Sequence, residues 1–368
     1  MMLGSLLIPF ECKSLKLTNR FVMAPMSRYF APGGTPGQDI ADYYRRRVEG
    51  GVAGVITEGV AVDAPGSVAA DSIPHFHGES AMQGWRQVVD DVHQAGGAFI
   101  PQLWHVGGCT DFNFPDSPHD PLLSPSGLVG ADIAGGRAMT EEDIADVVAS
   151  FARAAKDAVK IGCDAVELHG AHGYLFDQFF WDVTNKRTDR YGGLDIATRA
   201  RFAAETVAAI REAVGPQLAI IFRISQWKVY DYEARLARDP RELESWLAPL
   251  VDAGVDIFHA SERRFWEPTF EGSDLNLAGW VKAVTACPTI TVGSIGLSRD
   301  LMADFVDGIS QPEIEKLDEL RRRFERGDFD LVAVGRALLS DPQWLHKVLT
   351  NDLSDLKPYT LVTKDLLY

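Results

Sequence analysis

The sequence has little cysteine and lacks the features of secreted or membrane-spanning proteins. Four cysteines occur in 368 residues, without a Cys-x-x-Cys pair: Cys12, Cys109, Cys163 and Cys287. Such scattered thiols favour a reduced, cytoplasmic protein over a disulfide framework or a zinc site. No apolar run approaches the roughly 20 residues of a membrane helix, and the first residues lack the basic segment of a secretory signal. We therefore expect a cytoplasmic protein without a membrane segment.

The chain also lacks an excess of positive charge. Its 36 Lys and Arg stand against 52 Asp and Glu, which gives a formal net charge of −16. A protein that coats nucleic acid needs basic residues to neutralise phosphates, so no nucleic-acid partner is expected. A local basic pocket remains compatible with this charge. The content of 46% hydrophobic and 24% charged residues is typical of a globular chain and argues against disorder.

Short apolar segments rich in β-branched residues recur along the chain and predict strands. They are, in order, Arg20–Ser27, Val52–Val60, Ala98–Val106, Asp164–Gly170, Gln217–Ser225, Asp256–Arg263, Pro288–Gly296 and Phe329–Ala337. Most are continuous apolar runs, as is typical of parallel strands covered on both faces. The clearest amphipathic helix begins after Thr140, an N-cap with Asp143 in a capping-box arrangement. Other helices are predicted at about 79–95, 195–213, 240–253, 277–285 and 341–350.

Eight strand–helix units in series predict an α/β fold of the (β/α)8, or TIM, barrel type. A doubly wound sheet would also alternate, but it should have a glycine-rich turn after its first strand, where this chain has Ala24–Ser27 (APMS). No linker or repeat divides the sequence, so we expect one domain over residues 1–368. Long connections follow strands and should lie at the C-terminal face, where active sites form: 107–139, 171–194, 226–238, 261–276 and 297–326.

The last two predicted strands end in Gly293-Ser294 and Gly335-Arg336. Loops after the seventh and eighth strands of this fold recurrently bind phosphate. Glycine allows close backbone approach, and arginine supplies a charged fork. The pattern favours phosphate binding. The alternative is that the glycines only turn the chain and Arg336 faces solvent.

Two imidazoles and a phenol fall within six residues at the fourth strand end, as His169, His172 and Tyr174. No metal site is expected, because neighbouring strand ends offer few further ligands. The imidazoles could donate hydrogen bonds to a substrate oxygen that becomes negative, and the phenol could donate a proton. The alternative is a structural role at the barrel rim. Arg223 should point into a buried region, where either a ligand or a structural ion pair would balance its charge.

Six longer motifs contain or adjoin these residues. They are Asn19–Arg28 (NRFVMAPMSR), Ile56–Gly59 (ITEG), Gln102–Trp104 (QLW), Val166–Gln178 (VELHGAHGYLFDQ), Asn185–Gly193 (NKRTDRYGG) and Val334–Arg336 (VGR). With them the chain, from about residue 5 to residue 350, resembles the Old Yellow Enzyme family of FMN-dependent NAD(P)H oxidoreductases. Larger members of that family add an iron–sulfur cluster, which is not expected here because no clustered cysteine motif follows the predicted barrel.

The resemblance implies that FMN binds at the barrel mouth. The implied contacts are Pro25, Ser27, Gly59, Gln102 and Arg223 at the flavin ring, and Gly293, Ser294, Gly335 and Arg336 at the phosphate. Arg223 would lie near N1 and O2, where negative charge collects on reduction, and Gln102 at the pyrimidine edge. Ser27 stands where the family commonly has Thr or Cys, which leaves the flavin potential open.

The resemblance also implies a ping-pong reaction. NADPH or NADH would reduce FMN and leave, and an electrophilic alkene or a nitro compound would then enter the same pocket, lined by Trp104. His169 and His172 would bind its activating oxygen. Hydride would pass from flavin N5 to the β-carbon, and Tyr174 would protonate the α-carbon. The acceptor and the preference between NADH and NADPH stay open.

The alternative function is a phosphate-recognising barrel lyase or isomerase without redox chemistry. It would use the same glycine and arginine loops, but such enzymes commonly need a Schiff-base lysine or a catalytic carboxylate at a strand end, and none stands out. A homo-oligomer is compatible with the sequence. The tail Lys357–Tyr368 could either cover a site or cross to a neighbour.

Two segments, Gln226–Lys228 (QWK) and Arg263–Pro268 (RRFWEP), are expected to place aromatic and basic groups on rim loops. They could shape the substrate pocket or bind the phosphates of the nicotinamide cofactor. The alternative is that Trp227, Phe265 and Trp266 only pack the rim together. Three further charged residues are expected to anchor loops rather than to catalyse: Arg187, Asp189 and Arg201.

Overall fold

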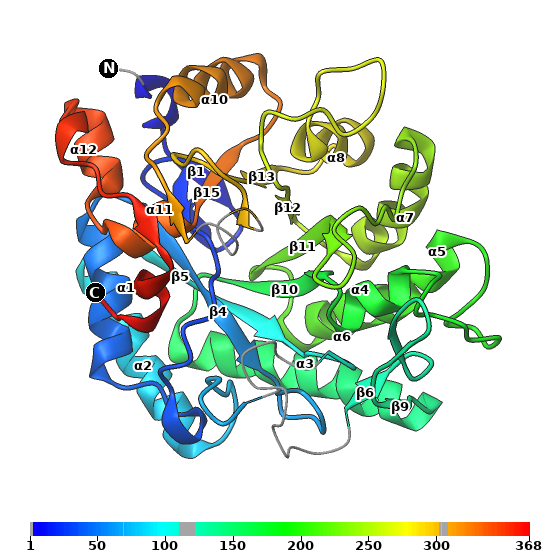
Figure 1. Ribbon diagram of the computed structural model, residues 1–368. Helices are drawn as coiled ribbons and strands as arrows, with labels where there is room; N and C mark the ends of the chain where they lie inside the picture. The colour runs from blue at the N-terminus through cyan, green and yellow to red at the C-terminus, as the bar shows by residue number, and fades with distance from the viewer. Residues whose placement is uncertain (1–2, 69, 110–121, 302, 304–307) are drawn as a thin grey trace.

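The computed structural model of the chain describes residues 3–68, 70–109, 122–301, 303 and 308–368 (Figure 1). Parallel strands close into a barrel in chain order: β3 (Phe21–Met23), β4 (Gly54–Ala61), β5 (Ala98–Trp104), β10 (Ala165–His172), β11 (Ala219–Lys228), β12 (Ile257–Ser261), β13 (Thr289–Val292) and β15 (Leu331–Val334). Pairing of β15 with β3 closes the ring. Each predicted strand coincides with one barrel strand to within a few residues, so the predicted (β/α)8 barrel is confirmed.

One end of the barrel is covered by a hairpin, β1 (Phe10–Cys12) and β2 (Leu15–Leu17). Its buried side chains join the apolar interior of the barrel. In the hairpin turn, Ser14 Oγ donates to the carbonyl of Asp164, 2.6 Å away, directly before β10 begins. The hairpin therefore covers the N-terminal end of the strands and leaves the C-terminal end for the long connections.

Helices surround the strands (Figure 1). They are α1 (Gln38–Glu49), α2 (Glu79–Gln94), α3 (Glu141–Ile161), α5 (Ile196–Arg199), α6 (Arg201–Val214), α7 (Pro240–Ala253), α8 (Leu277–Thr285), α10 (Glu315–Arg326), α11 (Arg336–Ser340) and α12 (Trp344–Thr350), with 3-10 turns η1 (Gly4–Leu6) and η2 (Pro32–Gly34). The capping box of Thr140 and Asp143 at α3 is confirmed. In the described part of the chain, no helix is both long and apolar enough to cross a membrane.

The predicted long connection over 297–326 contains a helix that the sequence analysis did not predict, because α10 occupies its second half. Only Leu317, Leu320 and Arg323 of this helix are buried, and its other residues are mostly charged. Leu317 and Leu320 keep helical spacing, but so few residues of this segment are apolar that the sequence analysis grouped it with the charged connection. Residues 302 and 304–307 of this connection lie outside the described residues.

The other connections carry short elements. The connection 107–139 holds β6 (Leu123–Ser124), β7 (Leu128–Gly130), β8 (Ile133–Ala134) and β9 (Arg137–Ala138), and its residues 110–121 lie outside the described part. The connection 171–194 holds α4 (Leu175–Phe180). The connection predicted from about residue 226 begins a few residues later, because β11 continues to Lys228, where it pairs with His172 of β10.

The C-terminal tail folds back onto the chain's own barrel, beside α1 (red in Figure 1). It contains η3 (Leu353–Asp355), β16 (Tyr359–Thr360), which pairs with β14 (Ile309–Ser310), and η4 (Leu361–Asp365). Arg28 donates to the carbonyls of Thr363 and Leu366, and Arg47 to that of Tyr368. The tail thus packs on the chain's own barrel through Arg28 and Arg47. Its two predicted roles, to cover a site or to cross to a neighbour, stay predictions.

Candidate active site

The inward-facing side of four neighbouring strands changes from apolar to polar at the barrel mouth. Side chains alternate along a strand, so residues two apart share a face. The pairs are Ile100 and Gln102, Ala165 and Glu167, Ile221 and Arg223, and Ile257 and His259, in which the first residue belongs to the barrel's apolar interior and the second is a buried polar residue. The fold thereby collects polar groups from separate strands into one layer.

A hydrogen-bonded chain crosses this layer from β5 to β12. Gln102 Nε2 donates to Glu167 Oε1 at 2.7 Å, and the other carboxylate oxygen of Glu167 lies 2.7 Å from Nδ1 of His259. Glu167 and His259 are fully buried, and Gln102 is almost so. A buried carboxylate that has lost its water needs such partners, and their fixed geometry makes this layer rigid.

Arg223 lies in the same layer and is nearly inaccessible to solvent. Its Nη2 donates to Ser261 Oγ at 3.3 Å, whereas its Nε has no hydrogen-bond partner within the described residues. Burial lowers the pKa of Arg223 to about 10, and the Glu167 carboxylate opposes that shift. The guanidinium is therefore still charged at neutral pH. The prediction that Arg223 points into a buried region is confirmed.

Four aromatic rings meet above this layer. The Tyr174 ring centroid lies 4.9 Å from those of Trp104 and His169, and the two histidine rings are 5.1 Å apart. Trp104 packs directly over Gly59 of β4, where an added Cβ would lie 2.7 Å from the indole. The structure thus brings the predicted substrate-facing residues together and shows why position 59 has no side chain.

Both histidines are neutral at physiological pH. Burial lowers the pKa of His169 and of His172 well below the usual value, and the nearby Arg223 charge lowers both further. His169 Nδ1 is buried and has no hydrogen-bond partner among the residues described. A neutral imidazole can donate one hydrogen bond without introducing a second buried charge beside Arg223.

The ends of β13 and β15 form a second polar group beside the first. Gly293 has a φ of 158°, and an added Cβ would lie 2.8 Å from the carbonyl oxygen of Glu262. Ser294 Oγ lies 2.9 Å from the carbonyl oxygen of Arg299, to which Arg336 Nη2 also donates at 2.9 Å. Arg336 is half-buried, and its guanidinium is held against this loop.

Gly335, also a predicted phosphate residue, precedes Arg336 at the start of α11 and packs beside Met26 and Ala24 of the first strand end. Pro25 in that segment is buried and Ser27 is exposed. The buried Glu58 fixes the residue after Ser27, because its Oε2 accepts the backbone N–H of Arg28 at 2.7 Å. Burial raises the pKa of Glu58 to about 7.

One rim prediction is wrong. Lys228 was expected among the basic groups of a rim loop, but its side chain is fully buried and forms an ion pair with Asp177 of α4 at 2.9 Å. The physical reason is that β11 continues to this residue, and its side chain is buried against α4 instead of lying on a loop. Trp227 stacks on the His172 ring at 4.2 Å between centroids, so it borders the substrate-facing rings.

The second rim segment is a packed and charge-matched unit. Phe265 is fully buried and meets Trp266 edge to face at 5.1 Å. Arg263 and Arg264 both pair with Asp300, at 3.4 and 2.9 Å. These contacts favour the alternative in which the segment packs the rim together. Arg187 pairs with Asp189, as predicted for a loop anchor. The same prediction is wrong for Arg201, because its pair with Glu205, at 3.8 Å, lies within helix α6.

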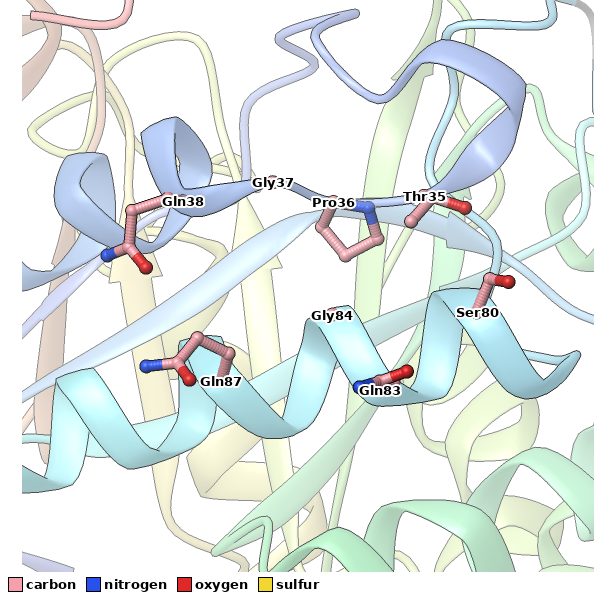
Figure 2. A pocket seen from close by; sticks show the side chains of 8 residues that line it. All are labelled: Thr35, Pro36, Gly37, Gln38, Ser80, Gln83, Gly84 and Gln87. Carbon is pink, nitrogen blue, oxygen red and sulfur yellow. The ribbon is translucent and has the colours of Figure 1, made fainter.

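A surface hollow outside the barrel is unrelated to these residues. It lies between the segment before α1 and the start of α2 (Figure 2). Its lining is Thr35, Pro36, Gly37, Gln38, Ser80, Gln83, Gly84 and Gln87. No strand-end residue lines it and its side chains carry no charge, so it offers no chemistry to the site. Among the described residues, no cluster of three His, Cys, Asp or Glu side chains could hold a metal ion.

The sequence analysis missed Glu167, His259 and Ser261 as parts of the site. Each stands inside or at the end of an apolar segment. Glu167 follows Ala165 by two positions, and His259 and Ser261 follow Ile257 by two and four. That two-residue period along β10 and β12 is the signal that could have found them.

The site fits a flat, polar, anionic cofactor. Buried atoms at the mouth that have no partner within the described chain are Trp104 Nε1, His169 Nδ1, Arg223 Nε and His259 Nε2. A buried donor without a partner is costly, so these atoms mark where ligand atoms complete the layer. Together with the glycine–arginine group on β13 and β15, this arrangement defines a barrel oxidoreductase of the flavin-binding class.

The comparisons with known proteins agree. Residues 5–354 match the NADH:flavin oxidoreductase / NADH oxidase family. The chain belongs to this family, that of Old Yellow Enzyme, and is an FMN-dependent oxidoreductase that uses a nicotinamide cofactor.

Named relatives cover nearly the whole chain. It is 30% identical to 12-oxophytodienoate reductase 7 of Oryza sativa subsp. japonica, over 93% of this chain and 87% of the relative. It is 32% identical to chanoclavine-I aldehyde reductase fgaOx3 of Penicillium roqueforti, over 92% and 87%. The solved structure of morphinone reductase has a TM-score of 0.76 at 25% identity, over 94% of this chain and 89% of that one.

Proposed function

We propose that the protein reduces carbon–carbon double bonds that are activated by a carbonyl or nitro group. His169 and His172 bind the activating oxygen of the acceptor, and Tyr174 supplies the proton. The observation that carries this proposal is that the His169 ring centroid lies 5.1 Å from that of His172 and 4.9 Å from that of Tyr174 at the barrel mouth, and that His169 Nδ1 has no hydrogen-bond partner in the described part of the chain. Two named relatives reduce, by their names, an oxophytodienoate and an aldehyde.

In this proposal the polar layer holds the flavin ring and the β13–β15 group holds its phosphate. Arg223, Gln102, Pro25, Ser27 and Gly59 would hold the ring. The phosphate residues are Gly293, Ser294, Gly335 and Arg336. When bound, FMN supplies hydride transfer from the nicotinamide cofactor to the acceptor. A single mouth serves both partners in turn, which is why ping-pong kinetics are expected.

The chain's own side chains do the acid–base work. His169 and His172, both neutral, donate hydrogen bonds to the acceptor oxygen and stabilise the negative charge that grows there. As hydride reaches the β-carbon, Tyr174 Oη gives its proton to the α-carbon and regains one from solvent. Trp104, edge-on to the Tyr174 ring at 4.9 Å, fixes its orientation. The alternative of a redox-free lyase or isomerase is not favoured, because the family match covers residues 5–354.

The test is a pair of anaerobic half-reactions on the FMN-loaded enzyme. Wild type should lose its yellow colour with NADH or NADPH and regain it with an activated alkene such as an enone or a maleimide. Tyr174→Phe should bleach at a similar rate but regain colour at least about tenfold more slowly, because it lacks the proton donor. Equal reoxidation of both proteins by the alkene would remove Tyr174 from this role.

We further propose that residues 1–368 act as one domain in a reducing, cytoplasmic environment. The four cysteines are free thiols, and Cys109 and Cys163 are buried. Burial raises the pKa of Cys109 to about 12, so this thiol stays protonated and unreactive. A homo-oligomer stays a prediction, to be checked by light scattering of the holoenzyme.

A further inference from the structure

The segment that carries His172 and Tyr174 has an unusual backbone. His172 and Gly173 have φ values of 66° and 88°, in the left-handed region. A residue with a side chain costs roughly 1 kcal/mol or more there, so surrounding contacts must hold His172 in place. The pairing of β10 with β11 also shifts register between Gly170 and His172. The positions of the His172 and Tyr174 side chains therefore depend on the contacts that hold this short segment in place.

One set of these contacts comes from β11 and β12. The His172 backbone N–H donates to Ser225 Oγ at 2.9 Å, and its carbonyl accepts from the Val229 N–H at 3.1 Å. Its ring lies between Trp227, at 4.2 Å, and Ser261, whose Oγ is 2.8 Å from Nε2. These contacts fix where His172 stands, but none of them reaches the turn to Tyr174.

The second set of contacts comes from the buried ion pair of Asp177 and Lys228. Asp177 Oδ1 lies 2.9 Å from Lys228 Nζ, and both side chains are fully buried. Lys228 Nζ also donates to the carbonyl of Gln226 at 2.8 Å, and the other oxygen of Asp177 accepts the Gly173 N–H at 2.6 Å. Lys228 is the pairing partner of His172 in the strand register. The ion pair thus links the end of β11, which pairs with β10 before the turn, to α4, which follows the turn.

Stability alone does not account for these two charges. Removing two ions from water costs several kcal/mol for each ion, and an apolar pair of similar size often stabilises a protein as well or better. Burial lowers the pKa of Lys228 and raises that of Asp177 to about 6, in line with this cost. What an apolar pair lacks is an oxygen acceptor aimed at the Gly173 N–H and a cation aimed at the Gln226 carbonyl.

We propose that Asp177 and Lys228 are positioning residues, which hold His172 and Tyr174 where the acceptor's oxygen and α-carbon need them. Neither residue touches the acceptor in this account, and the inference rests on the proposed function of His172 and Tyr174. Displacing a catalytic group by about 1 Å can lower the rate about a hundredfold, so we expect contacts that hold this segment to have a large effect on the rate.

The test uses FMN-loaded Asp177→Asn, Lys228→Met and the apolar double variant Asp177→Leu/Lys228→Met. Acceptor reduction is measured per bound FMN, alongside thermal unfolding. Each single variant leaves a buried group unbalanced and should unfold at a lower temperature. The double variant should regain most of that stability, and its kcat/KM for an enone should still be at least about tenfold below wild type. Asp157→Asn, which breaks the exposed Asp157–Lys160 pair, is the matched control and should match wild type.

The outcomes separate the two proposals. A double variant with both wild-type stability and wild-type kcat/KM would overturn the positioning role, as would single variants that lose stability without any change in rate per bound FMN. If the single variants do not fold, the double variant alone decides between these results. Wild-type holoenzyme that reduces no alkene would refute the proposed function, and with it this inference.

Discussion

The two halves of the barrel mouth differ in how their polar groups are satisfied. On the side of β5, β10, β11 and β12, buried donors such as Arg223 Nε and His169 Nδ1 have no partner in the described residues. On the side of β13 and β15, Arg336 and Ser294 already hydrogen-bond to the carbonyl of Arg299. The first side, proposed to hold the flavin ring and called the ring side, therefore presents buried donors without a partner in the described residues. The second side, proposed to hold the phosphate and called the phosphate side, presents groups that already hydrogen-bond to their own loop.

This difference predicts unequal contributions to cofactor binding. On the ring side a ligand can accept hydrogen bonds from donors that have no partner, so no existing bond has to break. The Gln102–Glu167–His259 chain also holds the layer rigid, which lowers the entropy cost of binding. On the phosphate side a ligand exchanges one acceptor for another, so each bond contributes less. We therefore expect the ring side to supply most of the binding free energy, and the four predictions below test that comparison, from the largest effect to the smallest.

Loss of the carboxylate at the centre of the ring side should be the most damaging change. Glu167→Ala leaves Gln102, His259 and the Arg223 charge without their buried partner. We expect the free energy of unfolding of the apoprotein to fall by about 3–5 kcal/mol, measured by urea denaturation. The control is Glu212→Ala, which removes an exposed carboxylate and should change the free energy of unfolding by less than about 0.5 kcal/mol. A small effect at Glu167 would mean that the layer is not a rigid unit.

Glu58, which fixes the loop beside Ser27, should produce a pH effect of similar size. Its pKa in the folded protein is about 7, against about 4.3 for an unperturbed glutamate. The folded state holds this proton more tightly, so its contribution to stability is complete below the unfolded pKa and is lost as pH rises towards 7. Relative to Glu58→Gln, wild type should lose about 3 kcal/mol of unfolding free energy between pH 4.5 and 8. Parallel curves for the two proteins would contradict a buried, proton-binding Glu58.

Arg223→Met removes the charged donor under the ring while keeping much of its volume. Because a hydrogen bond to a charged group contributes about 1.5–3 kcal/mol, FMN and riboflavin should both bind about 10- to 100-fold more weakly. Flavin fluorescence titration of the apoprotein measures both affinities. A variant that loses only FMN affinity would place Arg223 at the phosphate and invert the comparison.

Arg336→Met should have the smallest and most selective effect. FMN affinity should fall by about tenfold, because the arginine also serves the loop carbonyl of Arg299. Riboflavin affinity should stay unchanged, since riboflavin has no phosphate. Equal loss of both flavins would show that Arg336 supports the fold of the mouth rather than the phosphate.

The fold could be predicted from local sequence patterns, because buried parallel strands appear as apolar runs and amphipathic helices as apolar residues at a period of about 3.6. The same reasoning failed at α10, where only Leu317, Leu320 and Arg323 are buried. Within the site, glycines and histidines at strand ends were visible, since they stand out against apolar neighbours. The Asp177–Lys228 pair was not, because two charges that meet across α4 and β11 carry no spacing signal in the sequence.

The central claim, that the ring side of this mouth is built for a flavin, is tested most directly by titrating the apoprotein with riboflavin, FMN and ribose 5-phosphate under one condition. Riboflavin should bind with its fluorescence changed, FMN should bind more tightly by the contribution of the phosphate, and ribose 5-phosphate should bind most weakly. Tight binding of the sugar phosphate with no binding of riboflavin would contradict the account.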